Sequence, residues 1–262
     1  MPNTSGSHFS RSMTAGDIYT VAGNGTAGYS GDGTAAAGAE LSGPESVAFD
    51  ASGDLAIADM NNDVIRFVPL SSGSYYGQAM TADDIYTVAG DSTSWNGNSG
   101  IPATSAFLNG PIGIAVDAAG DLVIADYYTS GIRLVAASTG ELAGQSMTAG
   151  DIYTIAGNGY AKYSGDSGPA DQAELAAPWE VRVDATGDVV ITDSENDAIR
   201  FVPATSGTYF GQAMTAGDIY TIAGCQRSSN PAVFLSAVQV IQHPDVQVIP
   251  HFRGRGSTTW AP

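Results

Sequence analysis

The chain has 262 residues, 33 glycines, few charged residues and a formal net charge of −18. So acidic a surface repels phosphate backbones, which argues against nucleic acid as a partner. The single cysteine, Cys225, excludes an intramolecular disulfide and a cysteine metal centre. No apolar run is long enough to cross a bilayer, and residues 1–16 lack the apolar core of a signal peptide. As it stands the chain is predicted to be cytoplasmic, although a longer parent protein could be secreted.

One eleven-residue phrase, MTAGDIYTVAG and its close variants, dominates the sequence. Its four copies begin at Met13, Met80, Met147 and Met214, so each copy starts 67 residues after the last. A second phrase, SGPESVAFDASGDLAIAD from Ser42, keeps the same step in its two counterparts. A fixed period of this kind predicts a repeat array, in which each unit buries its apolar faces by stacking on the next.

Each repeat contains four short segments with the composition of strands. In the first, residues 47–49 and 55–59 alternate apolar and small residues around the turn DASGD, which indicates a tight hairpin. Residues 64–68 and 85–88 are rich in β-branched and aromatic side chains and predict the third and fourth strands. Four strands in a repeated series predict an all-β fold made of the four-stranded antiparallel blades of a β-propeller. A parallel β-helix is the rival, but its coils are shorter and lack successive tight turns.

The second phrase, GP-x-x-V-A-x-D-x-x-G-D-L-x-I-A-D followed by x-x-N-D-x-I-R, resembles the NHL repeat. The match covers residues 43–68, 110–135 and 178–202, and the linking segments resemble those of bacterial NHL arrays. The resemblance implies a propeller, and such propellers usually have about six blades.

The three copies depart from one another in ways that make them chemically unequal. In the third copy Ala177 replaces the glycine, and Arg182 stands where the others carry alanine. The second copy lacks the Asn-Asp pair and has Tyr127 and Tyr128 in that region.

The array is incomplete. Three full sets of strands are predicted within residues 17–224, and residues 18–22 are expected to form a spare fourth-type strand. Residues 1–16 are expected to be flexible, and the tail 225–262 has neither the GP phrase nor the Asp/Gly turn. An incomplete three-blade arc exposes apolar flanks, so self-association through open blade edges is expected. A truncated remnant without independent activity is a further interpretation.

Candidate binding residues gather on one predicted face. Connections in an antiparallel meander alternate between the two ends of a sheet, so the long loops share a face with the turns that follow IAD. Turn capping and loop packing are the simpler interpretation of the aspartates and aromatics there. If the protein binds a ligand, the residues expected to meet it are Trp95, Trp179, Arg182, Asp59, Asp126 and Asp193.

Two acidic turns, DMNND and DSEND, have the alternating oxygen groups that calcium prefers. Neither has a glycine at the sixth position or a carboxylate at the twelfth, so neither is an EF-hand loop. Hairpin capping explains them more simply. No cofactor is predicted. Calcium is the one alternative retained, and its candidate ligands are Asp59, Asp63, Asp193 and Asp197.

A recurring arginine at positions 66, 133 and 200 has two interpretations. It can form an anion site, or it can tie neighbouring strands through a carboxylate such as Asp59. The second is favoured.

Enzymatic chemistry finds little support in the sequence. His8, His243 and His251 lie outside the repeats, and no serine or cysteine has the surroundings of a nucleophile. We therefore predict a non-catalytic interaction module that binds a protein or a small ligand on one propeller face. The alternative is a calcium-dependent propeller lyase or lactonase.

Overall fold

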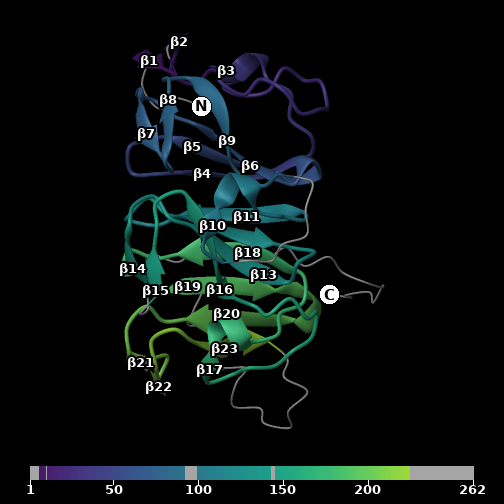
Figure 1. The fold of residues 1–262 in the computed structure, drawn as a ribbon, viewed down its shortest axis with the longest axis vertical. Coiled ribbons are helices and arrows are strands. Elements are labelled where there is room, and N and C mark those ends of the chain that lie inside the picture. The colour runs from purple at the N-terminus through teal and green to yellow at the C-terminus, as the bar shows by residue number, and fades with distance from the viewer. Residues whose placement is uncertain (1–5, 10, 92–98, 143–144, 225–262) are drawn as a thin grey trace, which may run out of the picture.

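The computed structural model describes residues 6–9, 11–91, 99–142 and 145–224. Three five-stranded antiparallel sheets are stacked along the long axis, with the N-terminal sheet at one end (Figure 1). The helical segments among the described residues are single 3-10 turns of three residues each. The prediction of an all-β fold built from antiparallel blades is confirmed. We number the three sheets blade one to blade three in chain order.

The strands have the same order across each of the three sheets. A two-residue strand lies at one edge and is followed by the fourth, third, second and first strands of the repeat. Blade one contains β3 (Thr34–Ala35), β9 (Asp84–Ala89), β6 (Val64–Val68), β5 (Leu55–Asp59) and β4 (Pro44–Phe49). Blade two contains β10 (Ile101–Pro102), β16 (Asp151–Ala156), β13 (Gly131–Val135), β12 (Leu122–Asp126) and β11 (Pro111–Val116). Blade three contains β17 (Gly168–Pro169), β23 (Asp218–Gly224), β20 (Ala198–Val202), β19 (Val189–Asp193) and β18 (Pro178–Val183).

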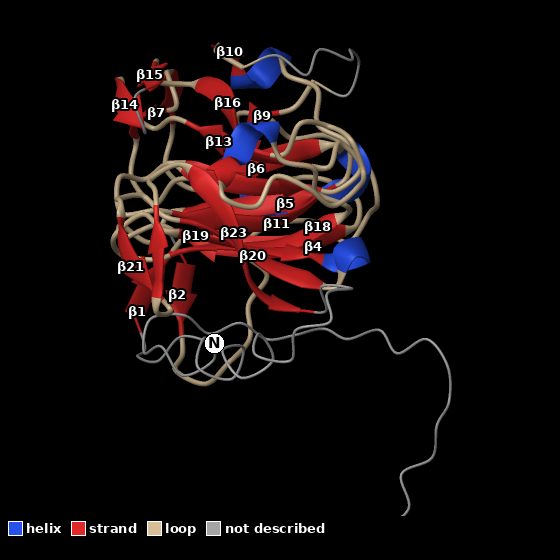
Figure 2. Cartoon of the chain, turned by 90° about the horizontal axis from the view of Figure 1, so that it is seen from below, coloured by secondary structure: helices blue, strands red, loops and turns tan. Residues whose placement is uncertain are grey.

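Two-stranded hairpins and 3-10 turns connect the strands of the blades. Two-stranded hairpins lie together on one side of the blades (Figures 1 and 2). They are β1 (Gly6–His8) with β2 (Arg11–Met13), β7 (Gly73–Tyr75) with β8 (Gln78–Met80), β14 (Gly140–Leu142) with β15 (Gln145–Met147), and β21 (Gly207–Tyr209) with β22 (Gln212–Met214). The 3-10 turns are η1 (Ala36–Gly38), η2 (Met60–Asn62), η3 (Ala103–Ser105), η4 (Ala170–Gln172) and η5 (Ser194–Asn196).

The fifth strand of each blade was not predicted. In blade one, β3 pairs with the outer strand β9 through Thr34 and Ile85, and the amide of Gly33 donates to the carbonyl of Ile85 at 2.8 Å. The long loop therefore returns across the outer edge of the sheet. This covers backbone groups that would otherwise offer an edge for pairing with another chain.

Packing between blades buries the apolar positions of both sheet faces. Ile65 and Phe67 of β6 belong to one core cluster with Ile114 and Ile124 of blade two. A second cluster joins Ile132 and Leu134 of blade two to Val181 and Ile191 of blade three, together with their neighbours. The predicted third-strand residues Ile65, Ile132 and Ile199 lie in β6, β13 and β20 as expected.

The N-terminal region differs from its prediction in two ways. Residues 18–22 do not form a strand, because no third strand among the described residues lies beside them to complete a ladder. Ile18 is 89% exposed for the same reason. In contrast, the segment expected to be flexible contains the hairpin of β1 and β2. The predicted atypical tail, 225–262, lies outside the described residues.

No helix among the described residues is long and apolar enough to span a membrane.

The first strands of blades two and three, β11 and β18, lie close together at Gly113. A β-carbon added there would lie 2.6 Å from the carbonyl oxygen of Trp179 and 2.9 Å from the α-carbon of Glu180. Both are backbone atoms, so a side chain can be accommodated only if the blades move apart.

We expect Gly113→Ala to lower the free energy of unfolding by about 1–3 kcal/mol, because it overpacks the interface between two blades. Gly140→Ala is the matched control, since Gly140 also lies in a strand and has no atom within 4 Å of an added β-carbon. Its effect should stay within about 0.5 kcal/mol. Urea unfolding of both variants measures the difference, and equal effects would contradict the close approach of β11 and β18.

Candidate functional site

The long loops and the turns after the second strands meet on one side of the blades, as the sequence predicted. The side-chain amide of Asn62 donates to the carbonyl of Gly28 at 2.8 Å, and that of Asn196 donates to the carbonyl of Lys162 at 2.9 Å. We call this side the long-loop face. The opposite side carries the hairpins, where the hydroxyl of Tyr76 donates to the carbonyl of Gly120 in the DAAGD turn at 2.8 Å.

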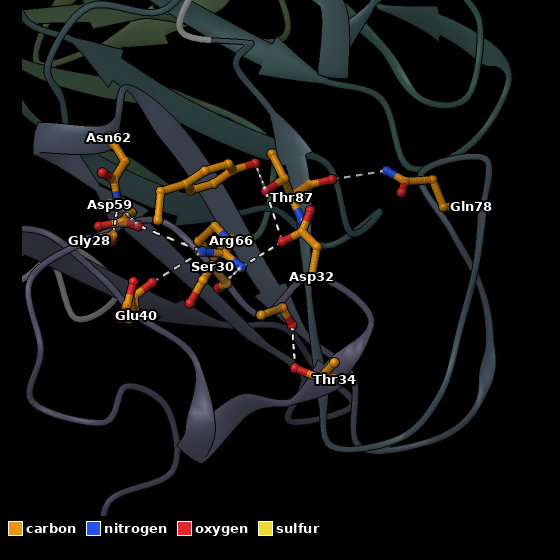
Figure 3. Close-up of polar contacts among 12 residues, drawn as sticks. Gly28, Ser30, Asp32, Thr34, Glu40, Asp59, Asn62, Arg66, Gln78 and Thr87 are labelled. Atoms are coloured by element: carbon orange, nitrogen blue, oxygen red, sulfur yellow. Dashed lines mark hydrogen bonds and ion pairs between the residues drawn. The ribbon is translucent and has the colours of Figure 1, made fainter.

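A buried arginine holds the long loop of blade one in place (Figure 3). The side chain of Arg66 is fully buried, and its Nη2 lies 2.5 Å from a carboxylate oxygen of Asp32 and 3.2 Å from the carbonyl of Ser30. The guanidinium also lies 5.1 Å from the ring centre of Tyr29, within the range of a cation–π contact. On its other side, Nη1 is 3.8 Å from Asp59.

Blade three repeats this arrangement. The buried guanidinium of Arg200 contacts Asp166 at 2.8 Å and Asp193 at 3.2 Å, and it lies 4.9 Å from the ring centre of Tyr163. The prediction that the recurring arginine ties strands through a carboxylate is confirmed. Because these guanidinium groups are fully buried, they offer no surface to an anion from solution.

Blade two lacks one carboxylate of this arrangement. Ser99 stands where the other blades carry Asp32 and Asp166, and its hydroxyl oxygen accepts the amide hydrogen of Thr154 at 2.8 Å. Burial lowers the pKa of Arg133, and the charge of Asp126 opposes that shift. Blade two thus places a buried arginine in a less acidic setting than its neighbours.

The three predicted aspartates lie below the surface. Asp59, Asp126 and Asp193 each have no exposed area. One carboxylate oxygen of each accepts a backbone N–H, from Ser42 at 2.6 Å, Asn109 at 2.8 Å and Ala176 at 2.7 Å respectively. In this structure they fix the start of the first strand, and a molecule at the surface does not reach them.

Burial shifts the titration of these carboxyl groups. It raises the pKa of Asp126 to about 7, against the opposing effects of Thr129, the amide of Asn109 and the charge of Arg133. Desolvation also raises the pKa of Asp59 and Asp193, where asparagine side chains, backbone amides and the arginines oppose it.

The calcium candidates are distributed among structural contacts. Asp63 accepts the amide hydrogen of Gly110 at 2.7 Å, a bond that links blade one to blade two. Asp63 and Asp197 both close their turns in the left-handed region, with φ of 55° and 51°. Within the described ranges, no three acidic, histidine or cysteine side chains are grouped so as to hold a metal ion.

Aromatic side chains gather where blades two and three meet on the long-loop face. The ring of Tyr127 lies 4.8 Å from that of Tyr128 and 5.7 Å from that of Trp179, both in edge-to-face contact. Tyr128 is 60% exposed, and Trp179 is half-buried. We call these three residues the aromatic cluster. The departure of the second repeat from the Asn-Asp pattern was the sequence signal for it, but the two tyrosines were not included among the predicted site residues.

The remaining predicted residues do not join this cluster. Arg182 is exposed and forms an ion pair with Glu180, on the face of β18 turned away from Val181 and blade two. Trp95 lies outside the described residues. The predicted site therefore divides into a surface part at Trp179, a separate ion pair at Arg182, and three buried carboxylates.

Comparison with known proteins shows a likeness at the level of the fold. No protein-family model and no curated protein matches the chain, so the NHL resemblance stays a prediction. The similar solved structures are β-propeller-like proteins. One is an auxiliary nutrient binding protein from Bacteroides thetaiotaomicron, which is 22% identical; the match covers 59% of this chain and 36% of that one, with a TM-score of 0.41. Another is virginiamycin B lyase from Staphylococcus aureus, which is 16% identical; the match covers 61% of this chain and 38% of that one, with a TM-score of 0.34. A third is a gluconolactonase from Xanthomonas campestris, which is 14% identical; the match covers 70% of this chain and 47% of that one, with a TM-score of 0.36. The chain spans less than half the length of each.

We expect Asp126 to make the protein less stable as pH rises. Its carboxyl group stays protonated up to about pH 7 in the folded chain but titrates near 3.8 when unfolded, so the folded state binds the extra proton between those values. From pH 4 to pH 8 this group should remove up to about 4 kcal/mol of unfolding free energy. Asp126→Asn should abolish that part of the pH dependence in urea unfolding at a series of pH values.

Asp193→Asn provides the contrast. It weakens a contact to the buried Arg200, so it should lower stability on both sides of pH 7. A pH profile of Asp126→Asn parallel to that of the unchanged chain would show that the Asp126 carboxyl group is ionised throughout.

Proposed function

We propose that the protein is a non-catalytic binding module that uses the aromatic cluster on its long-loop face to hold a protein segment or a small molecule. The observation that supports this most directly is the largely exposed ring of Tyr128, which packs edge-to-face on Tyr127, while Tyr127 packs on Trp179 of blade three. Aromatic side chains supply a large contact area at a low cost in conformational entropy, which suits a recognition surface.

The position of the cluster favours selective binding. Tyr127 and Tyr128 stand where blade one has Met60 and Asn61 and blade three has Ser194 and Glu195, so among the three turns only this one is aromatic. Gly110 lets Tyr128 lie close to the backbone, because an added β-carbon there would be 2.6 Å from its ring. The tyrosine is thereby supported from below, which reduces the ordering needed on binding.

The proposed ligand has an apolar or planar surface and carries no strong negative charge, because the chain itself is acidic. This is also why we propose no nucleic-acid partner.

The lyase or lactonase alternative needs solvent-accessible carboxylates that are free to bind calcium. Asp59 and Asp193 instead contact backbone amides, asparagine side chains and buried arginines. These contacts favour a structural role for both residues, so we rank the binding module first. The interpretation as a remnant without activity predicts that the aromatic cluster binds nothing.

To test the module, we would titrate the chain with a panel of disaccharides and of aromatic amino-acid amides, following the fluorescence of Trp179 in a variant with Trp95→Phe and Trp260→Phe. At least one class should give a saturable change. Tyr128→Ala should then weaken binding about three- to tenfold, the worth of one aromatic pair. Tyr160→Ala is the control, because Tyr160 is an exposed tyrosine in another loop. Equal losses in the two variants, or no saturable change with any probe, would contradict the proposal.

Calcium separates the module from the enzymatic alternative. We expect millimolar calcium to change the melting temperature by less than about 2 °C, because the carboxylates of Asp59, Asp63 and Asp193 already have protein partners and little net binding to the folded state can follow. A larger rise that Asp59→Asn and Asp193→Asn abolish would favour the lyase or lactonase.

A further inference from the structure

The N-terminal residues reproduce the outer half of a blade. The amide of Gly23 donates to the carbonyl of Ala36 at 2.9 Å, as the amide of Gly90 donates to that of Ala103 at 2.9 Å, 67 residues later. The amide of Thr14 likewise donates to the hydroxyl of Tyr19 at 2.9 Å, which matches the bond from Thr81 to Tyr86. Residues 17–23 therefore lie where the fourth strand of a preceding blade would lie, against η1 and blade one.

The inner edge of this segment has no strand beside it in the described chain. In blade one the third strand pairs with the fourth through Arg66 and Thr87 and through Phe67 and Tyr86. The residues equivalent to Thr87 and Tyr86 are Thr20 and Tyr19, and they belong to no ladder among the described residues. Consequently Ile18 is 89% exposed, whereas the equivalent Ile85 is fully buried.

The surface beside this edge is apolar and open. Val47 and Phe49 of β4 are 57% and 58% exposed, while Ile114 and Val181, which are equivalent to Val47 in the next blades, are fully buried. The difference arises because Ile114 and Val181 each have a preceding blade packed on them. A groove of about 410 Å³ lies between the N-terminal segment, the long loop and the start of β4, and its lining includes Thr20, Ala22, Gly23, Leu41 and Pro44.

The blades show what fills the equivalent position elsewhere in the chain. It is a mostly apolar strand that carries one arginine, as in the sequence VIRFV of β6. Glu45 beside the groove and Asp17 at the start of the segment are exposed, so their charges favour a partner with a basic residue.

We propose that residues 17–22 form a docking edge that captures an extended, mostly apolar strand with one basic residue, supplied by another polypeptide. The captured strand pairs with the backbone of Thr20 and Ala22, and its apolar side chains cover Val47 and Phe49. The guanidinium of Arg11, which donates to the carbonyl of Thr20 at 2.8 Å in the free chain, is displaced or shares that carbonyl. This is strand addition, in which main-chain hydrogen bonds provide affinity and the alternate side chains provide selectivity. The surface is distinct from the aromatic cluster, so the two proposals succeed or fail separately.

The probe is a fluorescein-labelled, end-capped peptide with the sequence of residues 62–70, NDVIRFVPL, added to the full chain. We expect saturable binding by fluorescence anisotropy with a Kd below about 1 mM, and at least a tenfold slowing of hydrogen exchange within residues 17–22. Two N-methylated peptides, each blocking alternate amides, provide the decisive comparison. A strand docks by one edge, so one of them should bind and the other should not.

Two variants of the chain test the exposed apolar surface of β4. Val47→Asp should weaken peptide binding at least tenfold, because it places a charge under the docked apolar side chains. Val47 is largely exposed in the free chain, so the variant should keep its melting temperature, which shows that it folds. Tyr160→Ser, at an exposed position in another loop, should leave the affinity within about twofold of the unchanged chain.

Three results would overturn the proposal. The first is the absence of saturable binding up to about 1 mM peptide. The second is equal binding of both N-methylated peptides, which would indicate adsorption without strand pairing. The third is slow hydrogen exchange of residues 17–22 before peptide is added, in a monomer or in a dimer, because the edge would then be occupied already.

Discussion

The stacking of one blade's apolar face on the next is the constraint on which the rest of this structure depends. Each sheet has apolar side chains on both faces, so a blade is stable only when both are covered. Ile65 and Phe67 pack against blade two. Leu55 and Ile57 lie on the opposite face of blade one, where the N-terminal region covers them with Val21, Ala22 and Leu41. The same contact between repeats therefore explains both the stacked core and the position of the first residues of the chain.

A buried charge connects this core to the loops. Arg66 and Arg200 each extend from a third strand to an aspartate of the long loop and to an aspartate at the end of the second strand. Isolated buried charges are very costly, but a guanidinium with two carboxylates, backbone carbonyls and an aromatic ring around it is compensated. The long loops of blades one and three are consequently anchored to the folded core, and their aspartates form ion pairs with the buried arginines.

The three blades differ in the side chains that they expose. Blade two has Ser99 in place of the loop aspartate and two tyrosines in the turn after its second strand, and Tyr127 packs on Trp179 of blade three. The open flank of blade one differs again, because its exposed residues are Val47 and Phe49 beside an unpaired segment. One repeated scaffold thus presents two surfaces of different chemistry, an aromatic cluster and an apolar flank beside an unpaired segment.

The sequence by itself determined the blades, their four principal strands and the meeting of long loops and turns on one face, because strand period, turn chemistry and a fixed repeat are local properties. It also indicated the arginine–carboxylate tie. Only the tertiary structure decided which polar residues are accessible: Asp59, Asp126 and Asp193 looked like surface groups but are buried by loops that fold over them. The same is true of residues 18–22, whose strand-forming sequence is not sufficient without a neighbouring strand, and of Arg182, which alternation along β18 places away from Trp179. Burial, pairing and side-chain direction depend on residues far away in the sequence, and those are the quantities that locate a binding surface.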